Sequence, residues 1–320
     1  MRKSLKGARI LIVGGCGFIG SHLADRLLAE NASRVIILDN LFLGKMDNIK
    51  NALDSGAVFI KDDAEFEGVL EYVISEYGID VVFNCATKAL NYSFINPVSA
   101  FITNVTVIGR LLELQRKGMF ETLCHFSSSE VYGSAVYEPM DEDHPLNATT
   151  AYAAGKAAAD QMLRSYVNQF GSDAYIVRPF NNYGPRQNYE GALAGIIPLT
   201  AKRIIKGEPP EIHGTGDQSR DWIYVLDTVD AVFKLFDRMP KGEAVNIATG
   251  GQISMNDLVH KISAQMGYDG VILRKPARCA DVLCHNAGNA KMESMIKMTY
   301  TPFDEGLKTT LDWYRQVIHA

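Results

Sequence analysis

The sequence predicts an α/β fold in which helices cover both faces of a doubly wound parallel sheet. Short apolar runs, typical of strands that are buried on both faces, recur through residues 1–180. Helical patterns separate these runs, and such alternation indicates βαβ units with right-handed crossovers. A glycine-rich turn joins the first strand to the first helix. Beyond residue 180 the alternation is lost, which predicts a smaller mixed α/β region at the C-terminus.

The predicted elements follow one another along the chain. Short apolar runs bounded by glycine or polar residues place strands at 10–13, 35–38, 57–60, 81–84, 123–126 and 174–177. Apolar residues at helical spacing place helices at 21–29, 67–76, 98–116 and 152–170. Two later strands are expected at 221–225 and 244–247, the second returning to the sheet. We therefore expect one domain from 1–180, rejoined by about 222–250, and a second from 181–221 and 251–320.

Composition argues against several classes of protein. The 320 residues carry 32 Lys+Arg and 37 Asp+Glu, a net charge of −5, whereas proteins that bind nucleic acid present a basic face. No apolar run reaches the roughly 18–20 residues of a membrane span, and no signal sequence follows the basic N-terminus. The five cysteines form no CxxC pair, which favours a reducing compartment. We expect a cytoplasmic protein with neither nucleic acid nor a membrane as its partner.

The motif Gly14-x-x-Gly17-x-x-Gly20 lies between the first predicted strand and the first predicted helix. Glycines let such a turn close tightly and let the backbone approach a pyrophosphate, which the helix N-terminus stabilises. Asp39 follows the next strand about twenty residues later, where a carboxylate accepts hydrogen bonds from the adenosine ribose and repels a 2′-phosphate. The sequence thus predicts a Rossmann-type domain that binds NAD rather than NADP.

Further residues join this predicted NAD site. Phe18 and Ile19 belong to the glycine loop itself, and Asn40 stands beside the ribose-binding carboxylate. Asp62 and Asp63 follow the third strand, and either one is a candidate to accept a hydrogen bond from the adenine amino group. A solvated turn explains these two carboxylates nearly as well.

Tyr152 and Lys156 stand four positions apart in a predicted helix, so their side chains share one face. A tyrosine with its ordinary pKa of about 10 is a poor base at neutral pH. A nearby ammonium and the positive charge of an oxidised nicotinamide favour the phenolate and lower that pKa. Ser128 follows the strand 123–126, from which its hydroxyl could share the proton of a substrate hydroxyl. Such a Tyr–Lys pair is common on exposed helices, but the glycine loop and the serine favour a catalytic interpretation.

Five stretches of the chain resemble one known family. They read GGCGFIG (14–20), SSSEVYG (127–133), YAAGK (152–156), RPFNNYGPR (178–186) and QSRDWIYV (218–225). On these motifs the chain resembles the extended short-chain dehydrogenases/reductases, in their nucleotide-sugar epimerase/dehydratase branch. The resemblance implies that Tyr152 is the catalytic base, that Lys156 is its partner and a ligand of the nicotinamide ribose, and that Ser128 completes the set.

The resemblance also implies a nucleotide-diphosphate sugar as substrate, bound by the second domain. Phe180 would then lie beside the nicotinamide, and Asn104 would join the cofactor site. Asn181, Arg220 and Arg278 would hold the diphosphate, where charge-assisted hydrogen bonds suit arginine. Surface salt bridges are the alternative for the two arginines.

Relatives in this branch dimerise through the helices that correspond to 98–116 and 152–170. The resemblance therefore implies a homodimer, although packing against the sheet explains the same apolar stripes. No metal site is expected, because Cys284 and His285 alone do not make a ligand set.

Three reactions in this branch begin alike, with transfer of a hydride from the sugar C4 to NAD, which gives a 4-keto sugar. A 4-epimerase returns the hydride to the opposite face, a 4,6-dehydratase loses water, and a glucuronate decarboxylase loses carbon dioxide. Ser129-Glu130 stands where one dehydratase subgroup carries Asp-Glu, so the acid for the C6 hydroxyl is missing. Other dehydratases and the decarboxylases carry Ser-Glu. Glu130 is either a second base or a structural acid.

The segment 85–93, CATKALNYS, favours the first of these reactions. It resembles the segment after the fourth strand of galactose-type 4-epimerases, which places a lysine, here Lys88, near the cofactor pyrophosphate. Asn91, Tyr92 and Ser129 are then candidates for the sugar pocket, although loop packing also explains the first two. We expect an NAD-dependent nucleotide-sugar 4-epimerase. A dehydratase or decarboxylase that uses Glu130 is the alternative, and a non-catalytic NAD-binding regulator is a remote one.

Overall fold

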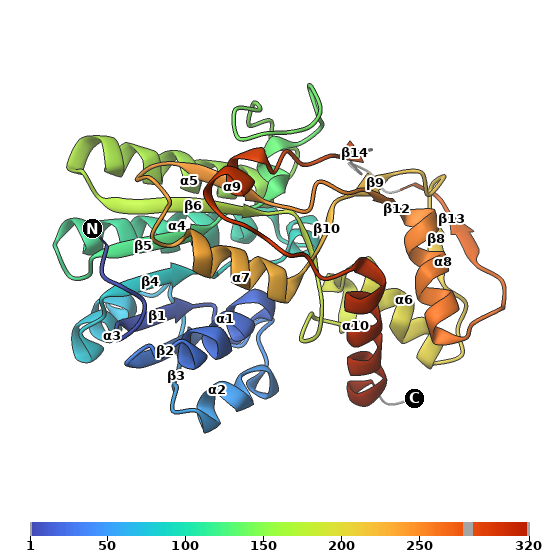
Figure 1. The fold of residues 1–320 in the computed structure, drawn as a ribbon, viewed down its shortest axis with the longest axis horizontal. Helices are drawn as coiled ribbons and strands as arrows, with labels where there is room; N and C mark the ends of the chain where they lie inside the picture. Colours follow the sequence, from blue (N-terminus) through green and yellow to red (C-terminus); the bar gives the residue numbers. More distant parts are fainter. Residues whose placement is uncertain (1, 278–283, 319–320) are drawn as a thin grey trace.

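A computed structural model describes residues 2–277 and 284–318 and confirms the predicted α/β architecture (Figure 1). Its centre is a parallel sheet of seven strands in the order β11-β6-β5-β4-β1-β2-β3. These strands are β1 (Arg9–Val13), β2 (Arg34–Asp39), β3 (Val58–Lys61), β4 (Val81–Asn84), β5 (Thr122–Phe126), β6 (Asp173–Pro179) and β11 (Ala244–Ile247). The strand order reverses between β1 and β4, and open α/β sheets bind ligands at the carboxyl ends of the strands on either side of such a reversal.

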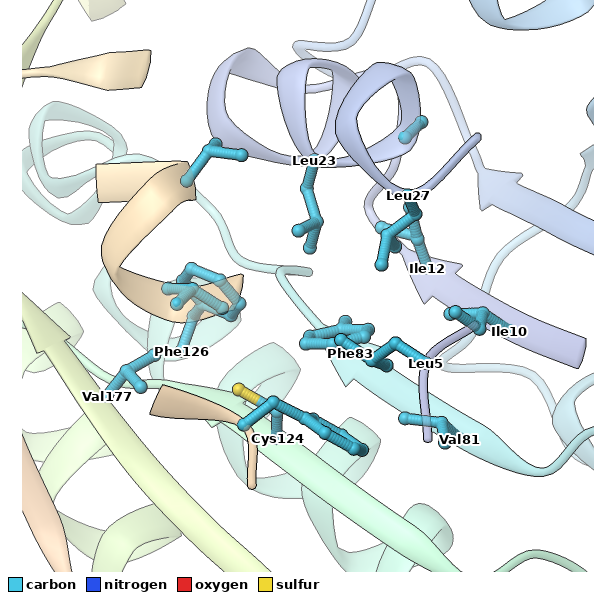
Figure 2. Close-up of a cluster of buried hydrophobic side chains, with 14 of the residues drawn as sticks. Leu5, Ile10, Ile12, Leu23, Leu27, Val81, Phe83, Cys124, Phe126 and Val177 are labelled. Atoms are coloured by element: carbon cyan, nitrogen blue, oxygen red, sulfur yellow. The ribbon is translucent and has the colours of Figure 1, made fainter. Parts of the chain in front are cut away.

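Helices cover both faces of the sheet, and alternate strand residues supply the two cores. One core joins the strands to α1 (Phe18–Ala29) and α7 (Val225–Leu235). The other joins them to α3 (Val69–Tyr77), α4 (Pro97–Arg116) and α5 (Ala151–Phe170). Figure 2 shows Leu23 and Leu27 of α1 directed at Ile10, Ile12 and Phe83 of the sheet. This two-sided burial is why the strands are continuous apolar runs in the sequence.

A smaller cluster of helices lies to one side of the sheet in Figure 1, around α6 (Ile196–Ile205), α8 (Met255–Met266) and α10 (Phe303–Val317). The short strands near it are β7 (Asn181–Tyr183), β8 (Glu211–His213), β9 (Ser219–Arg220), β10 (Trp222–Tyr224), β12 (Ile253–Ser254), β13 (Leu273–Lys275) and β14 (Cys284–His285). The remaining helices are α2 (Lys50–Asp54), α9 (Ala290–Met295) and the single turns η1 (Met46–Ile49), η2 (Leu90–Phe94), η3 (Ser129–Tyr132) and η4 (Gly191–Leu193). We propose that this cluster and its short strands form the substrate domain.

The structure departs from the predicted elements in several places. Helix α1 begins at Phe18 rather than residue 21, because the glycine loop itself forms the first helical turn. The predicted strand 221–225 is shorter, since β10 ends at Tyr224 and α7 begins at the next residue. Strand 244–247 returns to the sheet beside β6, as expected. A later segment, predicted to belong to the second domain, also returns to the first, because Met292 and Ile296 pack in the same core as α1 and α7.

Helix α4 corrects the expectation that no segment is long and apolar enough to span a membrane. Within the described residues, α4 alone meets that criterion by length and composition. Polar and charged residues of α4, such as Asn104 and Arg110, interrupt its apolar sequence. The helix therefore contains no continuous apolar run of the length expected for a membrane span. Val107, Ile108 and Leu111 of α4 are buried against the sheet, and a core helix of a soluble protein meets the same criterion.

Candidate active site

Two cavities of about 320 and 690 Å³ meet at the carboxyl ends of the central strands. The first follows the glycine loop and the ends of β1 and β2. The second extends from the end of β6 toward α6 and β8. Tyr152 and Gln187 line both cavities, so the predicted catalytic tyrosine lies at their junction.

The glycine loop is shaped by close backbone contacts. Gly14 has φ +79°, and a Cβ there would stand 2.8 Å from the Ala86 backbone. A Cβ on Gly20 would stand 2.5 Å from the Gly14 carbonyl oxygen. No described side chain caps α1 at Gly17, and no acidic residue occupies its first turn. The N–H groups at this helix start therefore suit an anion such as a pyrophosphate.

Asp39 lies at the end of β2 with its carboxylate buried under the loop. Its Oδ2 accepts a hydrogen bond from Cys16 N at 2.9 Å, and its Oδ1 accepts one from Leu41 N at 2.8 Å. Burial raises the pKa of Asp39, while these backbone hydrogen bonds oppose the rise. Each carboxylate oxygen can accept more than one hydrogen bond, so Asp39 can shape the loop and still bind a ribose.

The structure brings most of the predicted cofactor residues together. The first cavity is lined by Gly14, Gly17, Phe18, Ile19, Gly20, Asp39, Asn40, Asp62, Asp63, Lys88, Tyr152 and Lys156. Asn104, which was also predicted for the cofactor site, does not line this cavity within the described residues. It lies behind Thr87, whose Oγ1 donates a hydrogen bond to Asn104 Oδ1 at 2.8 Å. Phe180 lines the second cavity instead.

Lys88 lies at the rim of the first cavity between an aromatic ring and a carboxylate. Its Nζ is 4.0 Å from the centre of the Phe42 ring and 3.9 Å from Glu65 Oε1. Thr103 Oγ1 donates to the same oxygen at 2.7 Å. The contact between Lys88 and Phe42 is a cation–π interaction, which fixes the ammonium beside the cavity.

Tyr152 stands in the first turn of α5, where Thr150 caps the helix by accepting a hydrogen bond from Ala153 N at 3.1 Å. Burial raises the pKa of Tyr152 to about 12 and Glu130 adds to the rise, while hydrogen bonds with the hydroxyls of Ser128 and Thr87 lower it. The positive charges on which the sequence prediction depends must therefore offset the effect of burial.

Lys156 is only 1% exposed, and its Nζ donates a hydrogen bond to the Phe126 carbonyl oxygen at 2.7 Å. Burial lowers its pKa to about 8, and Asp160 and Cys85 oppose the fall. The side chain therefore remains mostly protonated at neutral pH. It supplies a buried positive charge one helical turn after Tyr152.

The second cavity contains most of the predicted substrate residues. Ser128, Ser129, Glu130, Asn91, Asn181 and Arg220 line it. Ser128 Oγ caps η3 by accepting a hydrogen bond from Glu130 N at 3.2 Å. Tyr92 lies apart, with its ring 5.0 Å from that of Phe42. Arg278 falls outside the described residues.

Several residues of the two cavities were missed by sequence reasoning. Asn182 Oδ1, Gln187 Oε1 and Trp222 Nε1 are buried and lack hydrogen-bond partners within residues 2–277 and 284–318, although their residues line the second cavity. Arg186 lines the first cavity, where its Nη2 donates to Asp25 Oδ2 at 2.7 Å. Its Nη1 is buried without a partner in the described chain, which suits an anionic ligand. The RPFNNYGPR motif contained Arg186, but nothing in the motif says where the guanidinium points.

The glycine loop, Asp39 and Arg186 fit a dinucleotide, and the Tyr–Lys–Ser set stands where that site meets a second cavity. This combination defines a nicotinamide-dependent enzyme of the extended short-chain dehydrogenase/reductase class. The chain belongs to the NAD dependent epimerase/dehydratase family, which matches residues 10–248. Its cofactor is NAD, which supplies reversible hydride transfer when bound.

Similar proteins carry out related reactions. The chain is 31% identical over 311 residues to a UDP-glucose 4-epimerase of Mycolicibacterium smegmatis, covering 96% of this chain and 98% of the relative. The crystal structure of Thermotoga maritima UDP-glucose 4-epimerase with UDP-glucose matches at 30% identity and TM-score 0.91, covering 97% and 100%. A dTDP-glucose 4,6-dehydratase of Streptomyces venezuelae, solved with NAD and TYD bound, matches at 28% identity and TM-score 0.90, covering 97% of each chain.

Proposed function

We propose that the protein is an NAD-dependent 4-epimerase that acts on a UDP-sugar. The observation that carries this proposal is the position of Tyr152, which lines both cavities and has Ser128 as a hydrogen-bonding neighbour. A sugar bound in the second cavity meets the cofactor at that point. The similarity to UDP-glucose 4-epimerases along nearly the whole chain supports the same reaction.

The chain's own residues supply the proton chemistry of this reaction. The Tyr152 phenolate takes the proton of the C4 hydroxyl, and Ser128 hydrogen-bonds the same oxygen. NAD, held in the first cavity by the glycine loop, Asp39 and Arg186, would supply an acceptor for the C4 hydride and a donor to the opposite face of C4. When the C4 carbonyl of the 4-keto sugar is reduced again, Tyr152 gives its proton back to the C4 oxygen. Lys156 stabilises the phenolate by its charge throughout, so no net proton or hydride is consumed.

A dehydratase or decarboxylase is the second candidate, and Glu130 is the observation that favours it. Glu130 lines the substrate cavity and its charge raises the pKa of Tyr152, so the two groups lie near each other. A carboxylate in this position is suited to remove a proton from C5 of a 4-keto sugar. A relative with dehydratase activity has nearly the same fold.

The mass of the product separates these reactions. We expect incubation with UDP-glucose or UDP-N-acetylglucosamine to give a new sugar of unchanged mass, with no net accumulation of NADH. Loss of water as the main outcome would identify a dehydratase. Loss of carbon dioxide from UDP-glucuronate would identify a decarboxylase. Either result contradicts the proposed epimerase.

Tyr152→Phe tests the proposed base directly. We expect it to lower kcat by about 100-fold or more, because general acid–base catalysis typically contributes that much. Tyr166→Phe is the matched control on the same helix, since Tyr166 OH hydrogen-bonds Glu113 on α4 at 3.4 Å and lines neither cavity within the described residues. Equal activity of the two variants would contradict the assignment of Tyr152.

We also propose that the protein forms a homodimer through α4. Four large apolar side chains are exposed at its start and just before it, namely Phe94, Ile95, Val98 and Ile102. Exposed apolar side chains that follow one another so closely in the chain are typical of an interface.

A further inference from the structure

A row of buried polar side chains crosses the sheet beneath the Tyr–Lys pair. Asn84, His125, Arg178 and Asn246 come from β4, β5, β6 and β11, and each is at most 1% exposed. Asn84 is paired in register with His125, and Arg178 with Asn246. A charge in such a place is unfavourable unless it is compensated, so each group in the row requires a partner.

Asp160 of α5 provides the negative charge in this row and is itself 0% exposed. Its Oδ2 accepts hydrogen bonds from Arg178 Nη2 at 2.9 Å and from Arg178 Nε at 3.1 Å. Its Oδ1 lies 3.9 Å from His125 Nε2, and no cation bonds to it in the part of the chain that the structure describes. Burial raises the pKa of Asp160, while the charge of Arg178 and hydrogen bonds with Ser127 and Arg178 lower it. Arg178 therefore hydrogen-bonds only Oδ2 of the carboxylate, and Oδ1 has no cation bonded to it within the described residues.

Histidine does not supply the missing cation. Burial holds the pKa of His125 well below its usual range, and the positive charge of Lys156 lowers it further. His125 Nδ1 lies 3.2 Å from Asn84 Nδ2, and a neutral ring that accepts there carries its proton on Nε2, toward Asp160. His125 is thus a neutral neighbour of the carboxylate.

Lys156 is the second cation whose charge is coupled to Asp160. Its Nζ hydrogen-bonds Phe126 O rather than the carboxylate, and Asp160 acts on it through space by opposing the fall of its pKa. The two residues are four positions apart in α5, so their side chains lie on one face of the helix. The other charged or titratable groups that act on this pair are Arg178 from β6, His125 from β5, Cys85 after β4 and Arg164 from α5. Lys156 and Arg178 together carry two positive charges against the single negative charge of Asp160, which leaves one positive charge to balance a Tyr152 phenolate.

We propose that Asp160 is a positioning residue whose carboxylate keeps the buried Lys156 side chain charged beside Tyr152. Arg178 hydrogen-bonds Oδ2 of Asp160 and anchors the carboxylate to the sheet. The negative charge of the carboxylate also stabilises the Lys156 ammonium, which would otherwise lose its proton more readily because water is excluded from this region. This role rests on the proposed functions of Tyr152 and Lys156, and it is independent of which sugar is the substrate.

The test measures the protonation of Lys156 in the NAD-loaded protein. Lysine labelled with ¹³C at Cε gives a carbon resonance whose shift follows deprotonation, and Lys156→Met identifies the resonance of Lys156. We expect the Lys156 resonance of the wild type to titrate below the ordinary lysine pKa of 10.5, because burial lowers the pKa of this side chain. Asp160→Asn should move that titration down by about one pH unit, since removing a nearby opposite charge has effects of this size. An unchanged titration in folded Asp160→Asn would overturn the proposal.

The pH dependence of turnover gives a second readout. In Asp160→Asn the alkaline limb of the kcat profile should move down by about one unit, with KM nearly unchanged. Asp173→Asn is the matched control, because Asp173 also pairs with an arginine, Arg2 at 2.8 Å, but at the opposite end of β6. The control should lose stability without moving either titration. A matching shift in the control would show a general effect of destabilisation and contradict the assignment.

A second variant covers the case in which Asp160→Asn does not fold. Asp160→Leu combined with Arg178→Met removes both charges and replaces them with apolar groups, which is often tolerated for a buried pair. The Lys156 titration should again move down, because its carboxylate is gone. Failure of both variants to fold would assign a purely structural role to Asp160 and overturn the proposal. The lysine titration needs no sugar, so an error in the proposed reaction would not affect this result.

Discussion

At the scale of single residues, Lys156 carries a charge in a part of the molecule from which water is excluded. Its pKa falls from 10.5 in an unfolded chain to about 8 in the fold. We predict that Lys156→Met abolishes turnover but stabilises the protein at pH 7. The lowered pKa corresponds to about 3 kcal/mol of destabilisation, and loss of the hydrogen bond to Phe126 O offsets about 1–2 kcal/mol of that. Urea unfolding should therefore give a net gain of about 1–2 kcal/mol.

The pH dependence of this effect has a definite sign. Between pH 8 and 10.5 the unfolded chain holds a proton on Lys156 that the folded protein lacks, so the contribution of Lys156 to stability rises with pH in that window. The advantage of Lys156→Met should be greatest below pH 8 and should shrink as the pH approaches 10.5. A constant advantage across this range would contradict the lowered pKa.

Asp39 combines two roles that two substitutions separate. Asp39→Asn keeps an acceptor for the loop, whereas Asp39→Ala removes the hydrogen bonds from Cys16 N and Leu41 N as well. We predict that both variants bind NAD about 10-fold or more weakly, since a hydrogen bond to a charged group contributes about 1.5–3 kcal/mol. Both should discriminate less against NADP, because the repulsion of its 2′-phosphate is lost. Calorimetric titration with NAD and NADP measures these changes, and unaltered NAD affinity would refute the ribose-binding role.

At the scale of elements, the start of α5 fixes the position of Tyr152. Helix α5 begins at Ala151, and the side chain of Thr150 caps it by accepting a hydrogen bond from Ala153 N. We predict that Thr150→Ala lowers the free energy of unfolding by about 1 kcal/mol and also lowers kcat, because the first helical turn then frays beside the reacting group. Ser254→Ala is the control, since Ser254 caps α8 in the same way through Asp257 N at 3.0 Å. The control should lose similar stability and keep its kcat; an equal fall in kcat for both variants would contradict this prediction.

Elements were predictable from the sequence where one physical effect dominates. Strands such as β1 and β4 are buried on both faces, so their apolar runs are unambiguous. Helix α7 was not predicted, because its β-branched start continues the apolar run of β10 and only packing against α1 selects a helix there. Thr87 and Gln187 were missed for a related reason. Both lie on loops, and their approach to Tyr152 depends on how distant segments meet.

At the scale of the whole molecule, segments far apart in sequence close around the first cavity. Lys45 Nζ pairs with Glu190 Oε1 at 2.7 Å and lies 4.1 Å from the centre of the Tyr189 ring. Phe42, which lines the cavity, contacts Lys88 and Tyr92. The loop after β2 thus contacts both the η2 region and the loop after β7. The cofactor cavity and its connection to the substrate region therefore form only when these distant segments meet in the folded chain. For this reason the sequence motifs predicted the chemistry of the site but not its geometry.

The exposed patch on α4 predicts how whole molecules associate. Val98 is 70% exposed and Ile102 is 46% exposed, while the opposite side of the same helix is buried against the sheet. An apolar helix face of this kind is unfavourable in water unless a second copy covers it. We predict that light scattering detects a dimer for the wild type and a monomer for Ile102→Glu, because a charge placed in the interface cannot be solvated. Val271→Glu, at a 72% exposed position after α8, is the control and should remain dimeric. A monomeric wild type, or a dimer that survives Ile102→Glu unchanged, would exclude α4 as the interface.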